Sequence, residues 1–442
     1  MNASAFPLYL VAERPAASHP GTRAPLDLRS LIKSEADQCV KCGLCLPHCP
    51  TYGKTRDEGD SPRGRIALMQ ALADGRLPGD RRLAFHLDRC LACRACERAC
   101  PSGVRYGTLI DASRALLGPA RPGRSSPWLH DRLLAWVTAG PRRRRQTAHL
   151  LRLYRQSGLR WLARRSGLLR GLRLDRAEGL LPARAGSPRR RRDYYPPRGR
   201  ERGRVGLFAG CITDLLTPEV LDASIRLLTL AGYGVHLPAG QGCCGALHQH
   251  AGDLAAAGGL ARRNLAAFNA LRLDAVLYTA SGCGATLHDY PAWPAPDGAG
   301  AGFAAPVRDA TRFLADLDWP TDVAFAPLIR RAAIQDPCLQ RNVLRDASPP
   351  YRLLQRIPGL ETVALPGNEA CCGAAGAYML EQPALSDALR ADKLAALQRC
   401  GAELLVSANI GCALHLAAGL RQAGRALEVV HPVVLLERQL CR

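Results

Sequence analysis

Two runs of closely spaced cysteines near the amino terminus constrain this chain more than any other feature. Each run has the spacing C-x2-C-x2-C-x3-C-P, the first beginning at Cys39 and the second at Cys90. Where this pattern holds two 4Fe-4S clusters, the fourth cysteine of each run binds the cluster of the other run. The sequence therefore predicts two such clusters. Their expected ligands are Cys39, Cys42, Cys45 and Cys100 for one cluster, and Cys90, Cys93, Cys96 and Cys49 for the other.

The alternative interpretation of these runs is a pair of structural zinc sites, each with four thiolates from two C-x-x-C elements. Four tandem cysteines followed by proline, present twice, favour the clusters. Nearby cations stabilise an anionic cluster and raise its potential; the candidates are Arg63, Arg65, Arg89 and Arg94, with a solvated surface charge as the alternative for each. We assign no metal role to His48 or His86, because the cysteine count is complete without them.

The carboxyl-terminal half contains an internal repeat around a C-C-G sequence. A single cysteine precedes the pair by 32 residues in one copy and 33 in the other, and another follows by 39 and 40. The first copy contains Cys211, Cys243, Cys244 and Cys283, and the second contains Cys338, Cys371, Cys372 and Cys412. Apolar strands alternating with helices predict parallel sheets covered by helices. Because each cysteine follows a predicted strand, we expect the eight thiols to face one another across a pseudo-two-fold axis; small apolar core filler is the alternative.

Cysteine distribution and composition divide the chain into five parts. They are an N-terminal extension (1–30), a two-cluster head (31–120), a basic connector (121–203), a first CCG module (204–325) and a second CCG module (326–442). The expected fold class is α/β, with a small α-helical, ferredoxin-like head and a body of two pseudo-repeated modules with parallel sheets. A chain of 442 residues exceeds the usual size of one core.

Most of the formal charge of +22 lies in the connector, because residues 142–204 contain 21 Arg against 4 acidic residues. Nucleic-acid binding is not expected, since aromatic side chains are too sparse among these arginines to stack bases. Arginine alternates with leucine and tryptophan at helical spacing up to about residue 180, and proline and glycine then predict an exposed linker. We expect the connector to dock an anionic membrane face or an acidic partner; a solvated basic linker is the alternative.

Neither a membrane span nor a secretory signal is apparent in the sequence. The 18 cysteines are therefore expected to stay reduced and to serve first as ligands. The expected location is the cytoplasm, peripheral to the inner face of the cytoplasmic membrane. Nucleotide and flavin fingerprints are also missing from the sequence, so hydride removal is expected on another chain.

Several motifs carry a family resemblance. CVKCGLCLPHCPTY, DSPRGRI, QGCCGALHQH, TASGCG, ACCGAAGAY and SANIGC resemble the iron-sulfur subunit of bacterial glycolate oxidase, over nearly everything except the connector. The CCG modules resemble those of heterodisulfide reductase subunits. The resemblance implies an electron-transfer subunit that works with flavoprotein partners and passes electrons from a 2-hydroxy acid, with glycolate favoured, toward quinone. The alternatives are a D-lactate or glycerol-3-phosphate dehydrogenase subunit, and a thiol or disulfide reductase subunit.

Both modules depart from the heterodisulfide reductase pattern, which uses five cysteines ending in C-x-x-C for a non-cubane cluster. The positions three before and three after the last cysteine are Ala280 and Thr286 in the first module, and Asn409 and His415 in the second. Four thiols per module suffice for a third metal centre, either 4Fe-4S or zinc. Asp336 is a candidate oxygen ligand, with a cap as the alternative, and Cys400 and Cys441 are expected to be structural.

Overall fold

The computed structural model describes residues 27–122, 132, 135–171, 174–182, 191–293 and 302–441. The N-terminal extension expected over residues 1–30 therefore lies almost wholly outside the described part of the chain. Within the described part, no helix is both long enough and apolar enough to cross a bilayer.

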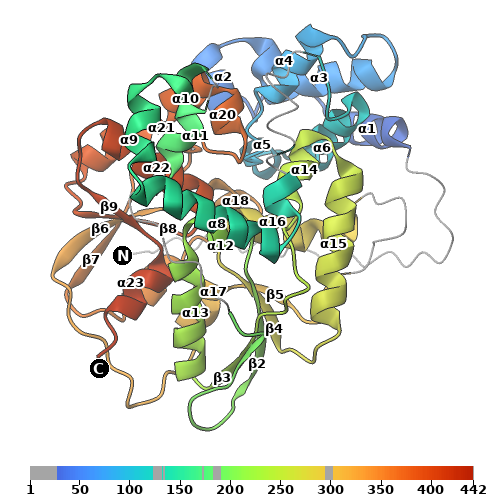
Figure 1. Cartoon of the computed structure of the whole chain (residues 1–442). Coiled ribbons are helices and arrows are strands. Elements are labelled where there is room, and N and C mark those ends of the chain that lie inside the picture. Colours follow the sequence, from blue (N-terminus) through green and yellow to red (C-terminus); the bar gives the residue numbers. More distant parts are fainter. Residues whose placement is uncertain are drawn as a thin grey trace, which may run out of the picture.

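The head is built from short helices packed around an apolar core (Figure 1). They are α1 (Leu28–Ala36), α2 (Pro50–Thr55), the 3-10 helix η1 (Glu58–Asp60), α3 (Pro62–Ala73), α4 (Arg81–Asp88), α5 (Ala95–Arg98) and α6 (Tyr106–Leu117). Side chains of Asp27, Ser61 and Asp80 accept hydrogen bonds from the first turns of α1, α3 and α4. Such caps satisfy amide groups that a helix start leaves unpaired. The cysteine runs begin in the loops after α1 and α4, so the helical core fixes both loops.

The first module contains a parallel sheet with strand order β3-β2-β4-β5. Its strands are β2 (Gly203–Phe208), β3 (Tyr233–His236), β4 (Ala275–Tyr278) and β5 (Val307–Asp309). The helices are α12 (Ile212–Leu216), α13 (Pro218–Leu230), α14 (Ala246–Ala251), α15 (Leu254–Asn269), α16 (Ser281–Asp289), η2 (Tyr290–Ala292) and α17 (Ala310–Ala315).

The second module repeats this arrangement with the parallel order β7-β6-β8-β9. Its strands are β6 (Arg330–Gln335), β7 (Leu360–Ala364), β8 (Leu404–Ser407) and β9 (Glu428–Val430). The helices are α18 (Cys338–Asn342), α19 (Pro349–Leu354), α20 (Tyr378–Glu381), α21 (Pro383–Arg399), α22 (Ile410–Gln422) and α23 (Pro432–Arg438). The predicted repeat and the predicted parallel sheets are both confirmed.

The two sheets share one hydrophobic core. Alternate residues of a strand point to opposite faces of its sheet. Val205 and Leu207 of β2 pack into the same core as Ala332 and Ile334 of β6. The opposite faces have separate cores, with Phe208 in the first module and Ala333 in the second. Both faces of each sheet are therefore packed in an apolar core, and the two modules share one of these cores.

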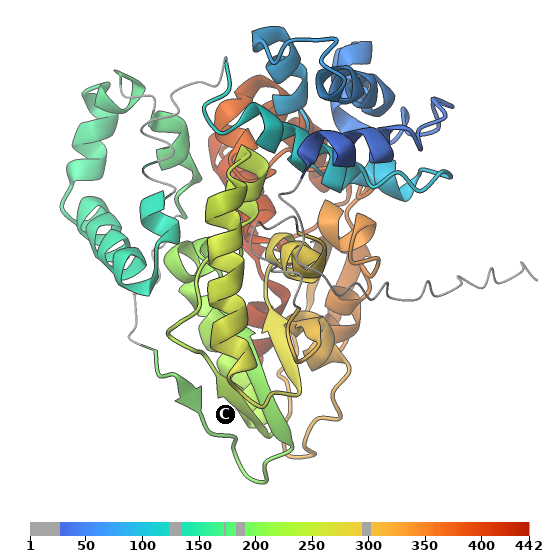
Figure 2. The same cartoon turned by 90° about the vertical axis from the view of Figure 1, so that its right-hand side faces the viewer.

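The connector forms a helical lobe beside the body, away from the head (Figure 2). Its described helices are α8 (Pro141–Gln156), α9 (Leu159–Arg165), α10 (Leu168–Gly171) and α11 (Asp175–Leu180). In the described part of the exposed linker expected after residue 180, Arg192, Asp193 and residues 198–202 are exposed, but other contacts hold the segment to the body. There, β1 (Tyr194–Tyr195) pairs antiparallel with β3, and Arg191 forms a 2.6 Å ion pair with Asp214. A partly buried carboxylate of the body thus anchors part of the basic segment.

Candidate metal centres

The thiols of the two cysteine runs line two hollows in the head. One is lined by Cys39, Cys42, Cys45 and also by Cys100. The other is lined by Cys90, Cys93 and also by Cys49. The fourth cysteine of each run therefore lies beside the first cysteines of the other run. Cys96 lines both hollows, so the two groups are neighbours.

The backbone takes the same unusual conformation in both runs. Lys41 and Ala92 occupy equivalent positions and have φ of 55° and 49°. Gly43 and Arg94, two residues further on, have φ of 85° and 57°. Left-handed residues are costly for side chains other than glycine and persist only where their surroundings enforce them. Alternating left-handed residues turn successive N–H groups toward one side, which makes a concavity suited to an anion.

The two thiol groups differ in exposure. Cys42 is exposed, and its neighbours Val40 and Leu44 are 70% and 57% exposed. Cys90 and Cys93 are buried, and burial raises the pKa of the Cys93 thiol well above its ordinary value. A buried thiol becomes a thiolate when a metal cation compensates its charge. Without such a cation, burial disfavours free thiolates in the second group.

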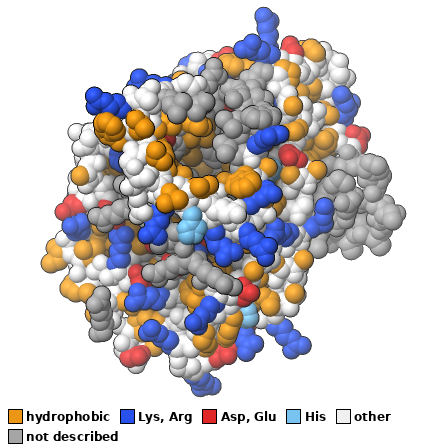
Figure 3. Space-filling view, viewed as in Figure 1, with side chains coloured by type: hydrophobic (Ala, Val, Ile, Leu, Met, Phe, Trp, Pro, Cys, Tyr) orange, Lys and Arg blue, Asp and Glu red, His pale blue; other side chains and the backbone are white. Residues whose placement is uncertain are grey.

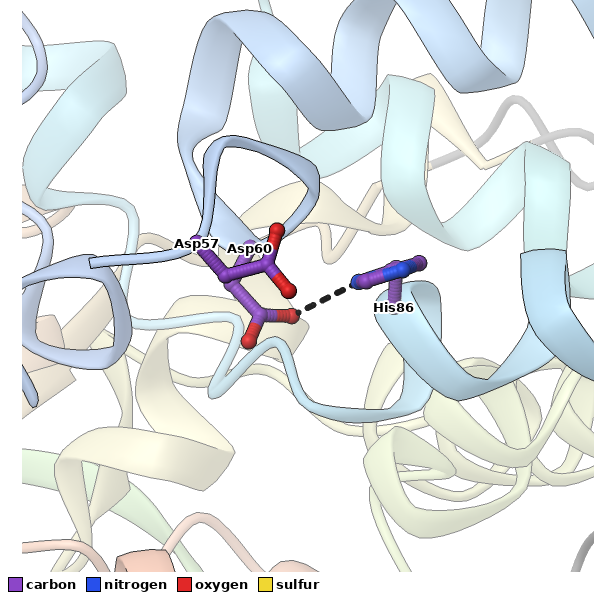
Figure 4. A group of neighbouring side chains, drawn as sticks. All are labelled: Asp57, Asp60 and His86. Carbon is purple, nitrogen blue, oxygen red and sulfur yellow. Dashed lines mark hydrogen bonds and ion pairs between the residues drawn. The ribbon is translucent and has the colours of Figure 1, made fainter. Parts of the chain in front are cut away.

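An ion-pair network lies behind the second thiol group. Asp57, Asp60 and His86 place ligand atoms within 4.8 Å of one another (Figure 4). The fully buried Asp60 carboxylate already receives hydrogen bonds from Arg65 at 3.3 Å and Arg89 at 2.6 Å. Two guanidinium groups would repel a divalent cation placed there. We therefore interpret this group as a charge network and not as a metal site.

The four arginines that the sequence singled out have different surroundings. Arg65 is buried and donates to Thr51 Oγ1, and Arg89 pairs with Asp60. Arg63 pairs with Glu58 on the surface. Arg94 bridges Glu97 and Asp289, so it ties the head to the first module. The Arg65 side chain reaches a thiol through Thr51, whose hydroxyl lies 3.3 Å from Cys49 Sγ.

The first CCG module brings its four thiols together at the carboxyl ends of its strands. Cys211 follows β2, and its Sγ lies 3.3 Å from that of Cys243. Cys244 contacts Cys283, which lies in the first turn of α16. Asn264, fully buried on α15, donates to the carbonyl oxygen of Cys243 at 2.8 Å and also contacts Tyr290.

The second CCG module repeats the chain of thiol contacts. Cys338 at the start of α18 contacts Cys371, and Cys372 Sγ lies 3.1 Å from Cys412 Sγ. Asn409 occupies a position where the five-cysteine pattern was considered, and it donates to Cys412 Sγ at 3.3 Å. Lys393 is buried beside these thiols, and burial lowers its pKa. Neither contact was foreseen from the sequence.

The remaining sequence candidates lie outside the thiol groups. Asp336 accepts a hydrogen bond from the Tyr351 hydroxyl at 3.2 Å. His415 is buried against Ser386. Cys400 contacts the backbone of its own helix, and Cys441 is exposed near the carboxyl terminus. The strand-end loops of the two modules meet where Ser281 N–H donates to Ala408 O, whereas the recorded thiol–thiol contacts of the described residues run within each module.

Comparison with known families fits this geometry. The 4Fe-4S dicluster domain matches residues 35–104, and the cysteine-rich domain matches residues 205–288 and 332–417. The linker region of the glycolate oxidase iron-sulfur subunit matches residues 125–181. A probable glycolate oxidase iron-sulfur subunit of Bacillus subtilis is 37% identical over 91% of this chain and 94% of its own length. The chain belongs to the glycolate oxidase iron-sulfur subunit family.

Other relatives differ in how much of this chain they match. The glycolate oxidase iron-sulfur subunit of Escherichia coli is 34% identical over 91% of this chain and 93% of its own length. Lactate utilization protein A of Geobacillus kaustophilus is 30% identical but matches only 52% of this chain, although that is 96% of its own length. Members of the glycolate oxidase family therefore share the head, connector and both modules with this chain.

Proposed function

We propose that this chain is the electron-transfer subunit of a flavin-dependent 2-hydroxy-acid dehydrogenase and that the head binds two 4Fe-4S clusters with crossed ligand sets. The first cluster takes Cys39, Cys42, Cys45 and Cys100. The second takes Cys90, Cys93, Cys96 and Cys49. The observation that carries the proposal is the placement of Cys100 and Cys49 beside the opposite runs, as the crossed scheme requires. The proposed domain boundaries lie at residues 30, 120, 203 and 325.

Glycolate is the substrate we propose for the complex. Oxidation of a 2-hydroxy acid releases a hydride, whereas a 4Fe-4S cluster passes single electrons, so a flavin on a partner subunit must separate the two electrons. The similarity to glycolate oxidase subunits over 91% of the chain favours glycolate over D-lactate, because the lactate protein matches only about half. The lactate assignment is the second candidate.

The exposed end of the head is the proposed docking point for a flavoprotein partner. Cys42 reaches the surface, and the apolar side chains of Val40 and Leu44 are exposed beside it. Burial of those side chains against a partner would exclude water and bring the partner's redox group close to the first cluster.

The connector is the proposed contact with the inner face of the cytoplasmic membrane, where quinone is available. Six of the eleven large apolar side chains that are exposed among the described residues lie between residues 136 and 162: Trp136, Leu150, Leu153, Leu159, Trp161 and Leu162. Arginines surround them, and Figure 3 shows apolar and basic side chains mixed over α8 and α9. Leucine and tryptophan with a basic rim suit the interface of an anionic membrane.

Deletion of this chain tests the proposed function. Membranes from the deletion strain should lose glycolate-dependent reduction of an artificial electron acceptor, and the intact chain should restore it. The purified chain alone should not oxidise glycolate or D-lactate. Loss of D-lactate oxidation with glycolate oxidation unchanged would transfer the assignment to the second candidate, and turnover by the isolated chain would exclude both.

A further inference from the structure

We propose that the two CCG modules have different roles: the second module holds an iron-sulfur centre that exchanges electrons directly with the second head cluster, and the first module lies off that path. The inference rests on the crossed ligand sets proposed above. The ligands of the centre in the second module are Cys338, Cys371, Cys372 and Cys412. The inequivalence is unexpected, because the cysteine spacing and sheet order of the two modules are nearly the same.

The first observation is direct packing between a head cysteine and the second module. Cys93 belongs to one buried cluster with Cys371 and Tyr378, and Cys338 packs against it. The thiols are close enough for Cys338 to raise the pKa of Cys93, after burial as the larger cause. Two metal centres held by these neighbouring cysteines would be separated by little more than their own ligands.

Hydrogen bonds fix this contact. The side chain of Asn342, at the end of α18, donates to the carbonyl oxygen of Cys93 at 2.9 Å. Arg98 of α5 donates to the carbonyl oxygen of Arg341 on the same helix at 3.1 Å. Lys54 of α2 forms an ion pair with Asp392 of α21 at 2.7 Å. The helix that begins with Cys338 is thus bound to the helix that follows Cys93.

The first module contacts the head differently. Arg94 pairs with Asp289, and His250 Nδ1 lies 3.0 Å from the carboxylate of Asp111. These groups are polar and lie at the carboxyl-terminal ends of α16 and α14, so the contact is made by charged side chains and not by the thiols. Its buried thiols lie in a separate apolar cluster with Trp293 and Tyr290. Among the described residues, that cluster contains no head cysteine.

The second observation is charge. Lys393, with 3% of its side chain exposed, lies beside Cys371, Cys372 and Cys412 and donates to Gly367 O. A buried cation requires an anionic partner, and a thiolate-bound cluster supplies one. Lys is also rare in this chain, which has only four among 60 basic Lys and Arg residues.

The first module has no matching buried lysine on its own long helix, where the neutral Asn264 lies near the thiols among the described residues. A cation that acts on the Cys211 thiol is Arg144 of the connector. Arg144 is already paired with Asp214 at 3.1 Å. Arg144 therefore already has a carboxylate partner, which it shares with Arg191.

The redox step is a single-electron exchange. The reduced head cluster loses one electron and returns to its oxidised form, while the centre of the second module gains that electron; no bond or proton has to move. Zinc cannot take part, because Zn²⁺ has no accessible second oxidation state. The proposal therefore requires iron in the second module.

Matched cysteine variants of the full chain test the proposal. Cys371→Ser and Cys243→Ser remove the first cysteine of the C-C-G pair in the second and first module respectively. The anaerobically purified wild-type chain should contain more than the about eight iron atoms of two cubane clusters. On reduction, the head clusters should show a magnetic interaction with a further paramagnetic centre.

We expect Cys371→Ser to lose both the additional iron and that interaction, while Cys243→Ser keeps both. Wild-type protein with only about eight iron atoms overturns the proposal, as does zinc in the second module. The opposite pattern in the two variants overturns it as well. The signals of the two head clusters test the proposed function separately. Their absence from the wild-type protein would contradict the proposed function and not the inference about the second module.

Lys393→Met gives a test that leaves every thiol in place. Removal of the buried positive charge should shift the potential of the additional centre to a lower value, and Lys393→Arg should shift it less. Lys33→Met, on the surface of the head, is the charge-matched control and should leave the potential unchanged. An equal potential in wild type and Lys393→Met would contradict the assignment of the centre to the second module.

Discussion

Arg65 donates a hydrogen bond through Nη1 to Thr51 Oγ1 at 3.0 Å, and that hydroxyl lies 3.3 Å from Cys49 Sγ. Because Arg65 also pairs with the buried Asp60, Arg65→Met should leave an incompletely paired carboxylate. We expect a loss of about 1–3 kcal/mol in stability, because Arg89 still pairs with Asp60, and a lower potential for the second head cluster. Calorimetry and a redox titration followed by electron paramagnetic resonance measure the two effects.

Arg63→Met provides the matched control for Arg65→Met. Its partner Glu58 is half exposed, so the pair should contribute no more than about 1 kcal/mol. Equal effects of the two substitutions on stability and potential would show that the buried network has no special role.

The crossed ligand scheme predicts opposite outcomes for two single substitutions. Cys49→Ser should damage the cluster held by Cys90, Cys93 and Cys96, because it lies in their hollow. Cys100→Ser should damage the cluster of the first run. Spectra of each variant after anaerobic reduction identify the cluster that is lost. Damage confined to the variant's own run would disprove the crossing.

Lipid binding should depend on the apolar side chains of the connector. Replacing Leu153 and Trp161 by Ser removes two side chains that are 62% and 63% exposed, so co-sedimentation with vesicles containing anionic lipid should fall severalfold. Ile329→Ser removes an exposed side chain of the body and should have no effect. Unchanged binding by the double variant would exclude this surface.

A partly buried histidine predicts a loss of stability in acid. His431 is 2.8 Å from the carbonyl oxygen of Thr279, accepts from Val433 N–H, and burial lowers its pKa to about 4. As the pH falls, the unfolded chain binds a proton at this histidine near pH 6.5, whereas the folded chain does so only near pH 4. The free energy of unfolding therefore decreases as pH falls from about 6.5 toward 4.

His431→Gln should therefore lower the thermal midpoint at pH 7.5 and reduce the further drop at pH 5.5. His149→Gln changes an exposed histidine of the connector and should behave as wild type. An identical drop in wild type and His431→Gln would show that acid destabilisation has another origin.

The regular part of this fold could be predicted because its signals are local. Apolar runs that alternate with helices predicted the parallel strands of both modules, and the structure contains them. Thiol spacing alone predicted that Cys49 and Cys100 lie beside the opposite runs, because the short gaps between ligands follow the geometry of a cluster.

Long-range contacts could not be predicted from the same patterns. Tyr194 and Tyr195 follow a proline-rich, basic stretch, yet they extend a sheet because β3 offers a free edge. Lys393 lies in a helix with ordinary polar spacing, and only the folded chain shows that it is buried beside thiols. The approach of Cys93 to Cys371 joins residues whose proximity depends on how the head and body pack.

The core shared by β2 and β6 has a consequence for the ancestry and handling of this protein. A duplicated unit that keeps its own core can be lost, exchanged or expressed alone. Here helices α13 and α17 of the first copy pack against α19 and α23 of the second, so proteolytic cleavage between the modules would release two halves that each expose apolar helix surface. We therefore expect the two copies to unfold together as one cooperative unit.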